Sequence, residues 1–206
     1  MPNADPSFSA AEYARRLNLV RAAMAERDID MMFLEDPSNM AWLTGYDGWS
    51  FYVHQGVIIM HDQEPVWWGR SQDGNGAVRT VWMDDARVST YPDNFVQTTE
   101  RHPMQHLAGK IRDLGFARRR IGLELDNYYF SAKAYLVLQE ELPDADLVDA
   151  TALVNWQRTV KSAEELALMR KAARISEAVI DGIVERIEPG LRKNELVAEI
   201  YADAIR

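Results

Sequence analysis

The feature that most constrains the fold is the order in which predicted strands and predicted helices follow one another. The strands are short apolar runs, and the helices have apolar residues at helical spacing. A capping box at Ser9 and Glu12 predicts a first helix, because these side chains satisfy free N–H groups of its first turn. Strands are predicted at residues 29–35, 40–43, 52–61, 65–69, 88–91, 121–125 and 146–149, with helices at 103–114 and 131–142. Hairpins followed by crossover helices indicate an α/β fold, a mixed β-sheet with helices on its faces.

Two polar segments interrupt this pattern. Asp36 to Asn39 has turn chemistry, since Pro37 pre-sets φ and the short polar side chains close a turn. Ser71 to Gly76 is polar and glycine-rich, and we expect a surface loop there.

The last part of the chain has a different character. A second capping box at Ser162 and Glu165 opens one long predicted helix, Pro189 and Gly190 break it, and a further helix follows from residue 194. We therefore expect two domains, residues 1–157 and 158–206. Because the final helix runs to the last residue without a cap, we also expect the second domain to be truncated.

Charge and composition exclude several classes of function. Lys and Arg number 23 against 32 Asp and Glu, a net charge of −9, which argues against nucleic acid and anionic membrane surfaces as partners. The chain has no cysteine for disulfides or thiolate metal sites. It has neither an apolar run of the roughly 20 residues that span a bilayer nor the pattern of a signal peptide. We expect a cytoplasmic protein.

The segment from Asn39 to Gln55 concentrates aromatic residues around two glycines. They are Trp42, Tyr46, Trp49, Phe51 and Tyr52, with Gly45 and Gly48 between them. Glycine permits positive φ, so a tight turn is predicted, and loops held at the surface carry binding sites. We interpret the segment as a ligand-binding loop between two strands. The alternative, that the rings fill a core, is the better interpretation for any single ring.

His54 follows these rings in the loop. Its unperturbed pKa near 6.5 makes it a titratable group at neutral pH. It is a candidate to hydrogen-bond a ligand carboxylate or amide, and a bond to a neighbouring loop is an equally good interpretation.

No complete active site is evident in the sequence. His102 and His106 stand four apart, but Pro103 occupies the position where the zinc motif needs a glutamate, so we place His102 at a helix entrance. Glu124 and Asp126 follow a strand, and we expect them to hydrogen-bond a turn. We therefore predict no catalytic and no metal-binding residue in this chain.

Two motifs together resemble the creatinase/prolidase family of pita-bread metallohydrolases. One is the run Asn39-Met-Ala-Trp-Leu-Thr-Gly45, and the other is Arg158-Thr-Val-Lys-Ser-Ala-Glu-Glu165 followed by Met169-Arg-Lys-Ala-Ala173. The segment from Glu188 to Leu191, with Glu195, resembles the turn between the first two catalytic-domain helices. The resemblance implies a creatinase-like N-terminal domain over residues 1–157 and the opening helices of the pita-bread domain over 158–206.

The same resemblance implies where the chemistry lies. In the family, two aspartates, a histidine and two glutamates surround a divalent metal pair, or no metal in creatinase itself, and these residues come after this junction. We therefore expect no cofactor in this chain and a divalent metal in the full-length enzyme. Members are commonly homodimers in which one N-terminal domain covers the partner's active site. Trp49, Phe51, Tyr52 and His54 would then contact a small-molecule substrate in the partner subunit.

The loop from Gly45 to Gln55 resembles most the ectoine hydrolase branch, which opens a cyclic amidine. Ring faces suit a delocalised cation of that kind. Matched to creatinase, the loop places its substrate-binding aromatic at Phe51, but Val53 stands where creatinase has an arginine, which argues against creatine. Two alternatives remain open: the same region of an Xaa-Pro dipeptidase, and a non-catalytic binding or dimerisation module.

Overall fold

The structure of the protein is a computed structural model, and it describes residues 6–205. The chain divides into two compact units, the first ending at Thr159 and the second beginning at Val160. The first unit is built on a six-stranded sheet with the order β4-β3-β2-β1-β5-β6. Its strands are β1 (Met31–Leu34), β2 (Gly56–Met60), β3 (Val66–Arg70), β4 (Val88–Tyr91), β5 (Arg120–Leu123) and β6 (Asp146–Asp149).

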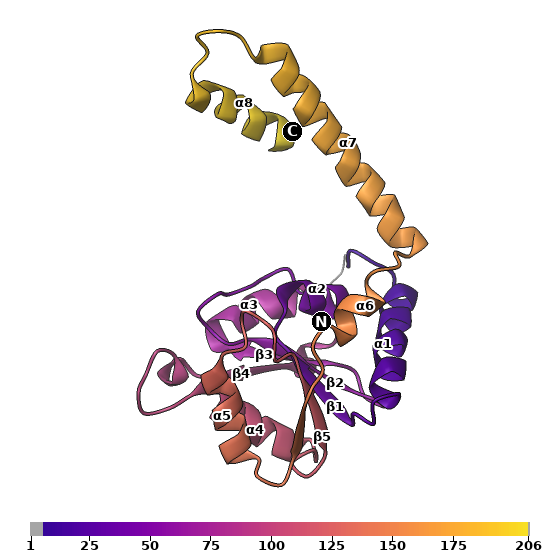
Figure 1. Cartoon of the computed structure of the whole chain (residues 1–206), viewed down its shortest axis with the longest axis vertical. Coiled ribbons are helices and arrows are strands. Elements are labelled where there is room, and N and C mark those ends of the chain that lie inside the picture. The colour runs from indigo at the N-terminus through magenta and orange to yellow at the C-terminus, as the bar shows by residue number, and fades with distance from the viewer. Residues whose placement is uncertain (1–5, 206) are drawn as a thin grey trace. The chain divides into compact units, whose positions relative to one another are not determined.

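The sheet is mixed. β2 runs antiparallel to both β1 and β3, while the pairs β1–β5, β5–β6 and β3–β4 are parallel. Helices cover both faces (Figure 1). One face carries α1 (Ala10–Ala25), α2 (Pro37–Thr44), α3 (Ser71–Thr80) and α6 (Leu153–Gln157), and the other carries α4 (Pro103–Asp113) and α5 (Ala132–Glu141). Short 3-10 turns lie at Asp85–Arg87 and Asp93–Phe95. The predicted fold class is confirmed.

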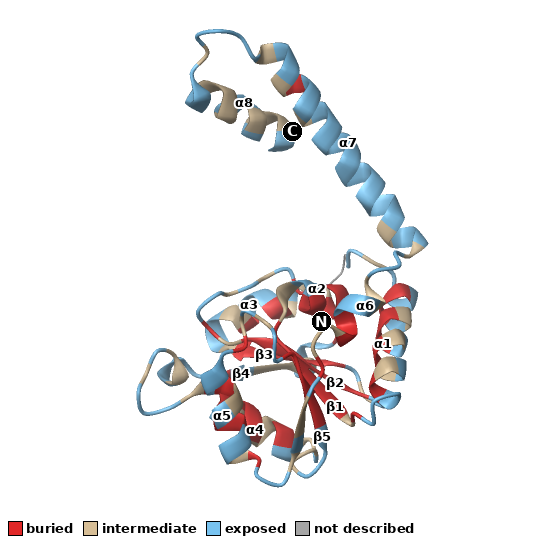
Figure 2. Ribbon diagram, viewed as in Figure 1, coloured by how far each residue is buried: buried red, intermediate tan, exposed pale blue. Residues whose placement is uncertain are grey.

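Each face of the sheet has its own hydrophobic core. In β1, Met32 and Leu34 pack into the cluster with α1 and α2, whereas Met31 and Phe33 pack into the cluster with α4 and α5. Alternate side chains of a strand point to opposite faces, and both faces are covered here. The central strands are therefore buried throughout (Figure 2), which is why they read as continuous apolar runs.

The strand predicted at residues 40–43 is wrong, because these residues lie in α2. The Asp36 side chain accepts a hydrogen bond from Asn39 N, Pro37 occupies the first turn, and Gly45 ends the helix with φ +78°. The signals interpreted as a turn at residues 36–39 are thus a helix N-cap and its first turn. The helix is short and mostly buried, so its apolar residues carry no helical periodicity that the sequence could show.

The surface loop predicted at residues 71–76 is also wrong, because these residues begin α3. A Cβ atom added to Gly74 would lie 2.5 Å from Cγ2 of Thr90 in β4. Glycine therefore allows this helix to approach the sheet closely, while polar residues of the same segment face solvent. Close approach to a neighbouring strand, and not a loop conformation, explains this glycine.

The second unit consists of two helices, α7 (Ala163–Arg186) and α8 (Lys193–Ile205). The predicted capping box is confirmed: Oγ of Ser162 accepts from Glu165 N, and the Glu165 carboxylate accepts from Ser162 N. Arg186 and Asp203 join the two helices by an ion pair of 2.6 Å. Across residues 6–205, no helix is both long enough and apolar enough to pass through a bilayer.

Substituting Gly45 tests the end of α2. An added Cβ would lie 2.7 Å from the Tyr13 hydroxyl and 3.1 Å from the Thr80 carbonyl oxygen, in a backbone conformation with positive φ. We expect Gly45→Ala to lower the free energy of unfolding by about 2 kcal/mol, measured by urea unfolding with tryptophan fluorescence. Gly109→Ala in α4 is the control: nothing lies within 4 Å of its Cβ position, so stability should stay unchanged or rise. Equal stability of the two variants would contradict this prediction.

Candidate functional site

The candidate site lies at one edge of the sheet. The pairing directions place the carboxyl ends of β1, β3, β4, β5 and β6 at the same edge, where β2 begins. In α/β sheets, ligands bind in the crevice outside the carboxyl ends of the strands. Residues 46–55 join α2 to β2 and run along this edge.

The structure divides the aromatic segment into two groups. Trp42 and Tyr46 are buried in the core, as the alternative interpretation required for individual rings. Trp49, Phe51 and Tyr52 are exposed by 60%, 75% and 51%. The strand predicted from residue 52 begins only at Gly56, so these three rings stand outside the sheet.

The exposed rings form a cluster with the connection between β5 and α5. The Phe51 and Tyr52 centroids lie 5.2 Å apart, and Trp49 lies 6.1 Å from both Phe51 and Tyr129. A cavity of about 220 Å³ opens beside the cluster, lined by residues 50–55, Glu35, Tyr128, Tyr129 and Ser131. The sequence did not indicate the two tyrosines as site residues, because only the fold brings this connection beside the loop.

His54 is held by a buried carboxylate. Its Nδ1 lies 3.1 Å from both carboxylate oxygens of Glu35, the residue that follows β1. The Glu35 side chain is 1% exposed and that of His54 16%. Burial alone would lower the pKa of His54, but the Glu35 charge and hydrogen bond raise it above its ordinary value. Burial raises the pKa of Glu35, with His54 acting against that shift. Both shifts favour a proton held between His54 and Glu35.

Two further groups fix the backbone and ring of His54. The Tyr91 hydroxyl donates to the His54 carbonyl oxygen at 2.6 Å. The His102 ring lies 5.2 Å from the His54 ring, and burial, together with the charge on His54, lowers the pKa of His102 to about 4. His102 is therefore neutral near pH 7.

His102 and His106 both make hydrogen bonds within the domain. His102 caps α4, accepting from Met104 N, and is thus at the helix entrance as predicted. Nδ1 of His106 accepts from Trp68 Nε1 at 3.1 Å. Among residues 6–205, no three His, Cys, Asp or Glu side chains are grouped so as to hold a metal ion.

Glu124, at the end of β5, connects the edge of the sheet to the start of α2. Its carboxylate accepts from the backbone N–H groups of Glu35 and Asp36 and from the side-chain amides of Asn39 and Asn127. The predicted bond between Glu124 and a turn is confirmed, with the correction that this turn begins a helix. Asp126 is exposed instead.

The same network brings together the two motifs that suggested the family. Nδ2 of Asn39 donates to Asn155 Oδ1 at 2.9 Å, and Arg158 Nη1 donates to Asn39 Oδ1 at 2.7 Å. Residues that are more than a hundred positions apart in the sequence therefore share one set of hydrogen bonds. Asn39 and Arg158, one from each motif, are therefore in direct contact in the folded domain.

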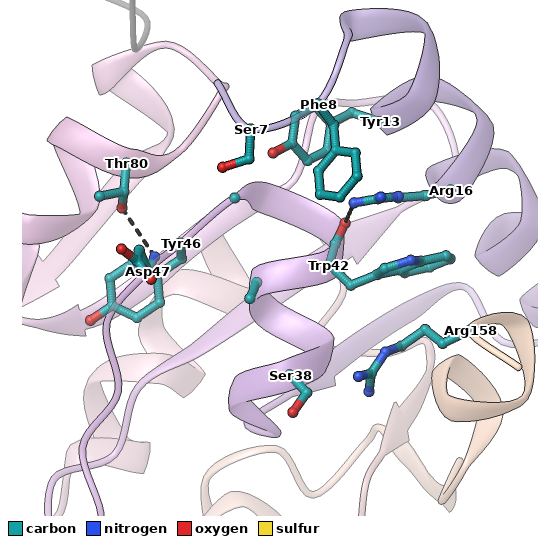
Figure 3. Close-up of a pocket in the computed structure, with 12 residues that line it drawn as sticks. Ser7, Phe8, Tyr13, Arg16, Ser38, Trp42, Tyr46, Asp47, Thr80 and Arg158 are labelled. Carbon is teal, nitrogen blue, oxygen red and sulfur yellow. Dashed lines mark hydrogen bonds between the residues drawn. The ribbon is translucent and has the colours of Figure 1, made fainter. Parts of the chain in front are cut away.

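A larger cavity, of about 600 Å³, lies where α1, α2 and α3 meet (Figure 3). The Arg16 guanidinium lies 3.8 Å from the Phe8 ring centroid and donates to the Trp42 carbonyl oxygen at 2.8 Å. Nε of Arg16 also donates to Glu12. These groups join α1 to α2, so we interpret this cavity as part of the contact between the two helices. The cavity beside the exposed aromatic rings is therefore taken as the candidate site.

Several known proteins match most of this chain. Residues 16–160 match the Creatinase/Prolidase N-terminal domain. The chain is 54% identical to ectoine hydrolase from Halomonas elongata, over 94% of this chain and 49% of that protein. An uncharacterized hydrolase/peptidase from Sinorhizobium fredii is 38% identical over 94% of this chain and 50% of its own length. The solved Xaa-Pro dipeptidase from Bacillus anthracis gives a TM-score of 0.72 at 18% identity, covering 94% of this chain and 49% of that chain.

The fold and these matches define an N-terminal α/β domain of a hydrolase family, followed by a separate unit of two helices. The chain belongs to the creatinase/prolidase family. It spans about half the length of the curated relatives it matches. The resemblance seen in the two sequence motifs is confirmed.

Glu124 provides a direct test of the edge network. In Glu124→Gln, one acceptor oxygen becomes an NH₂ group that faces other donors, so at least one buried hydrogen bond is lost. We expect the free energy of unfolding to fall by about 2–4 kcal/mol in urea titrations. Asp126→Asn, two residues further along the chain, changes an exposed carboxylate in the same way and should have little effect. A similar small effect of both substitutions would show that the Glu124 bonds contribute little.

Proposed function

We propose that this chain is the N-terminal substrate-capping and dimerisation region of a longer metal-dependent C–N hydrolase, the parent enzyme, which opens the cyclic amidine ring of ectoine. The observation that carries the proposal is the 54% identity to ectoine hydrolase over 94% of the chain. In this proposal the divalent metal and the catalytic residues belong to the part of the parent enzyme that the chain does not include. The chain alone is then inactive, and the parent enzyme acts in the cytoplasm.

The exposed ring cluster supports the substrate part of the proposal. Trp49, Phe51 and Tyr52 lie on one loop at the sheet edge, beside a cavity of about 220 Å³. Ectoine carries a delocalised amidinium cation and a carboxylate on a small ring. A cation of this type gains about 0.5–2 kcal/mol on each ring face that it contacts.

The same exposure supports the capping and dimer part of the proposal. Large exposed rings gathered on one loop mark a surface that meets a ligand or another protein. We propose that the loop of one subunit covers the active site of the other, with Trp49, Phe51, Tyr52 and His54 contacting the substrate. The parent enzyme is then a homodimer.

An Xaa-Pro dipeptidase is the competing candidate. The solved dipeptidase from Bacillus anthracis is 18% identical and therefore supports a shared fold alone. Assays of the parent enzyme with ectoine and with Xaa-Pro dipeptides separate the two functions, and we expect hydrolysis of ectoine. Preference for the dipeptides would replace the proposed substrate.

Phe51→Ala in the parent enzyme tests the role of the loop. Removing a ring that covers the substrate deletes about 1.5–3 kcal/mol of apolar contact, so kcat/KM for ectoine should fall roughly 10- to 100-fold. Leu136→Ala is the control, since it removes an exposed apolar side chain on α5, away from the cavity. An unchanged kcat/KM in Phe51→Ala would reject the role of Phe51.

A complementation experiment tests whether the loop acts across the dimer. Parent subunits with Phe51→Ala are mixed, after dissociation and reassociation, with subunits whose own catalytic residues have been substituted. If the loop covers the partner's site, the mixed dimer regains one functional site that combines an intact loop with intact catalytic residues. Activity that stays at the level of the two separate variants would show that each loop serves its own subunit.

A further inference from the structure

The two ring nitrogens of His54 have different surroundings. Nδ1 lies against both oxygens of the buried Glu35 carboxylate at 3.1 Å. Nε2 has no hydrogen-bond partner in the part of the chain that the structure describes, and 16% of the side chain remains exposed. The ring lines the cavity beside the exposed aromatic cluster. One nitrogen is therefore anchored, and the other is available to a ligand.

We propose that Glu35 is a positioning residue that keeps a hydrogen on Nε2 of His54, and that this N–H binds the carboxylate group of the ligand. The ligand class is a small zwitterion whose cationic part lies on the neighbouring rings. This inference rests on the proposed function, in which the loop contacts the substrate. It adds that His54 binds the carboxylate group of the ligand and that Glu35 sets the protonation of His54.

The number of protons that His54 and Glu35 share decides whether Nε2 carries a hydrogen. When the pair holds one proton, that proton lies either on the imidazole, which then has N–H groups at both nitrogens, or on Glu35, which then donates to Nδ1. In the second case the neutral ring carries its hydrogen on Nε2. Nε2 is therefore a donor wherever the proton lies, and the pair has no net charge to repel an anion.

When the pair loses that proton, Nε2 changes from a hydrogen-bond donor to an acceptor. The Glu35 carboxylate can then accept only from an N–H at Nδ1, which leaves Nε2 with a lone pair. A ligand carboxylate would face this acceptor as well as the negative charge of the pair. Carboxylate binding should therefore be strong at low pH and weaken as the pH rises through the pKa of the pair, which behaves as one titrating unit.

The groups around the His54–Glu35 pair raise the pH at which the pair loses its proton. Attraction to Glu35 raises the pKa of His54 above 6.5 although burial opposes it, and burial and Glu124 both raise the pKa of Glu35. On the other side His102 has a lowered pKa and is neutral near pH 7, and Lys133 contributes to that lowering. The pair therefore keeps its proton, and Nε2 its hydrogen, to a higher pH than an unperturbed histidine would.

The other ionisable side chains around the His54 ring do not reverse this pH dependence of carboxylate binding. Tyr91 has a raised pKa and stays a neutral hydroxyl that donates to the His54 carbonyl. Tyr52, Tyr128 and Tyr129 line the same cavity from the loop and from the β5–α5 connection. Arg101 lines a second cavity on the His102 side of the ring, and its positive charge favours an anion there.

The first experiment observes His54 itself in the 206-residue chain. Nitrogen-15 NMR of the imidazole reports which nitrogen carries hydrogen as the pH is raised. We expect Nε2 to be protonated at pH 6 and to lose its hydrogen in a transition centred above 6.5, the ordinary pKa of a histidine. In Glu35→Gln the transition should move to lower pH, because the attracting charge is gone. A wild-type ring with hydrogen on Nδ1 alone at pH 6 would overturn the proposal without any ligand.

The second experiment measures carboxylate preference in the full-length parent enzyme, stripped of divalent metal so that nothing is hydrolysed. Dissociation constants are compared for ectoine and its decarboxylated ring, 2-methyl-1,4,5,6-tetrahydropyrimidine, and for Gly-Pro and Gly-prolinamide. A charged hydrogen bond from His54 predicts a preference for the carboxylate member of roughly 10- to 100-fold. The preference should be lost in His54→Ala, shrink at neutral pH in Glu35→Gln, and persist in the control His61→Ala, which lies at the far end of β2.

The outcomes separate this inference from the proposed function. A preference that depends on His54 and Glu35 in the ectoine pair supports both. The same dependence in the Gly-Pro pair alone supports the inference and rejects ectoine as the substrate. A preference that survives His54→Ala, or no preference in either pair, overturns the inference, whatever the enzyme hydrolyses.

Discussion

The candidate site depends on two buried carboxylates at the ends of adjacent parallel strands. Glu124 follows β5 and bonds the backbone N–H groups at the end of β1, and Glu35 follows β1 and holds His54. A buried carboxylate without partners costs several kcal/mol, so its donors are fixed in place by the need to pair it. The first carboxylate sets where α2 begins and the second sets where the loop returns to the sheet. The rings between them are therefore carried on a segment anchored at both ends.

Much of the fold could be predicted from the sequence because its strands are buried on both faces. Such strands appear as apolar runs, and the crossover helices α4 and α5 have separate apolar faces and caps at His102 and Ser131. The errors at α2 and α3 have one cause. In α2 and α3 the residue choice is set by packing against neighbouring elements, as Gly74 against Thr90 shows, and local patterns give no sign of that.

The candidate site could be predicted only in part for a similar reason. The aromatic segment was recognisable, but which rings are buried depends on α2: Trp42 lies within that helix and Tyr46 directly follows its end, whereas Trp49 and Phe51 lie beyond it. The partner of His54 was hidden because Glu35 is 19 residues away and looks like the polar end of a strand. A single charged residue directly after a fully apolar strand was the one available signal. The contributions of Tyr128 and Tyr129 had no signal, since only the parallel pairing of β1 with β5 brings them near.

The exposure of the three loop rings indicates that this surface contacts another molecule. The chain buries Trp67, Trp68 and Tyr91 completely, so it has the means to cover large rings. Fully burying one such side chain stabilises the fold by about 1.5–3 kcal/mol. Trp49, Phe51 and Tyr52 are exposed, so each lacks most of this stabilisation. The cost is recovered only when another surface or a ligand covers them. Since Glu35 and Tyr91 hold the neighbouring His54 in place without help from the rings, their exposure is not a consequence of a loosely held loop. The rings are presented outward by an anchored segment.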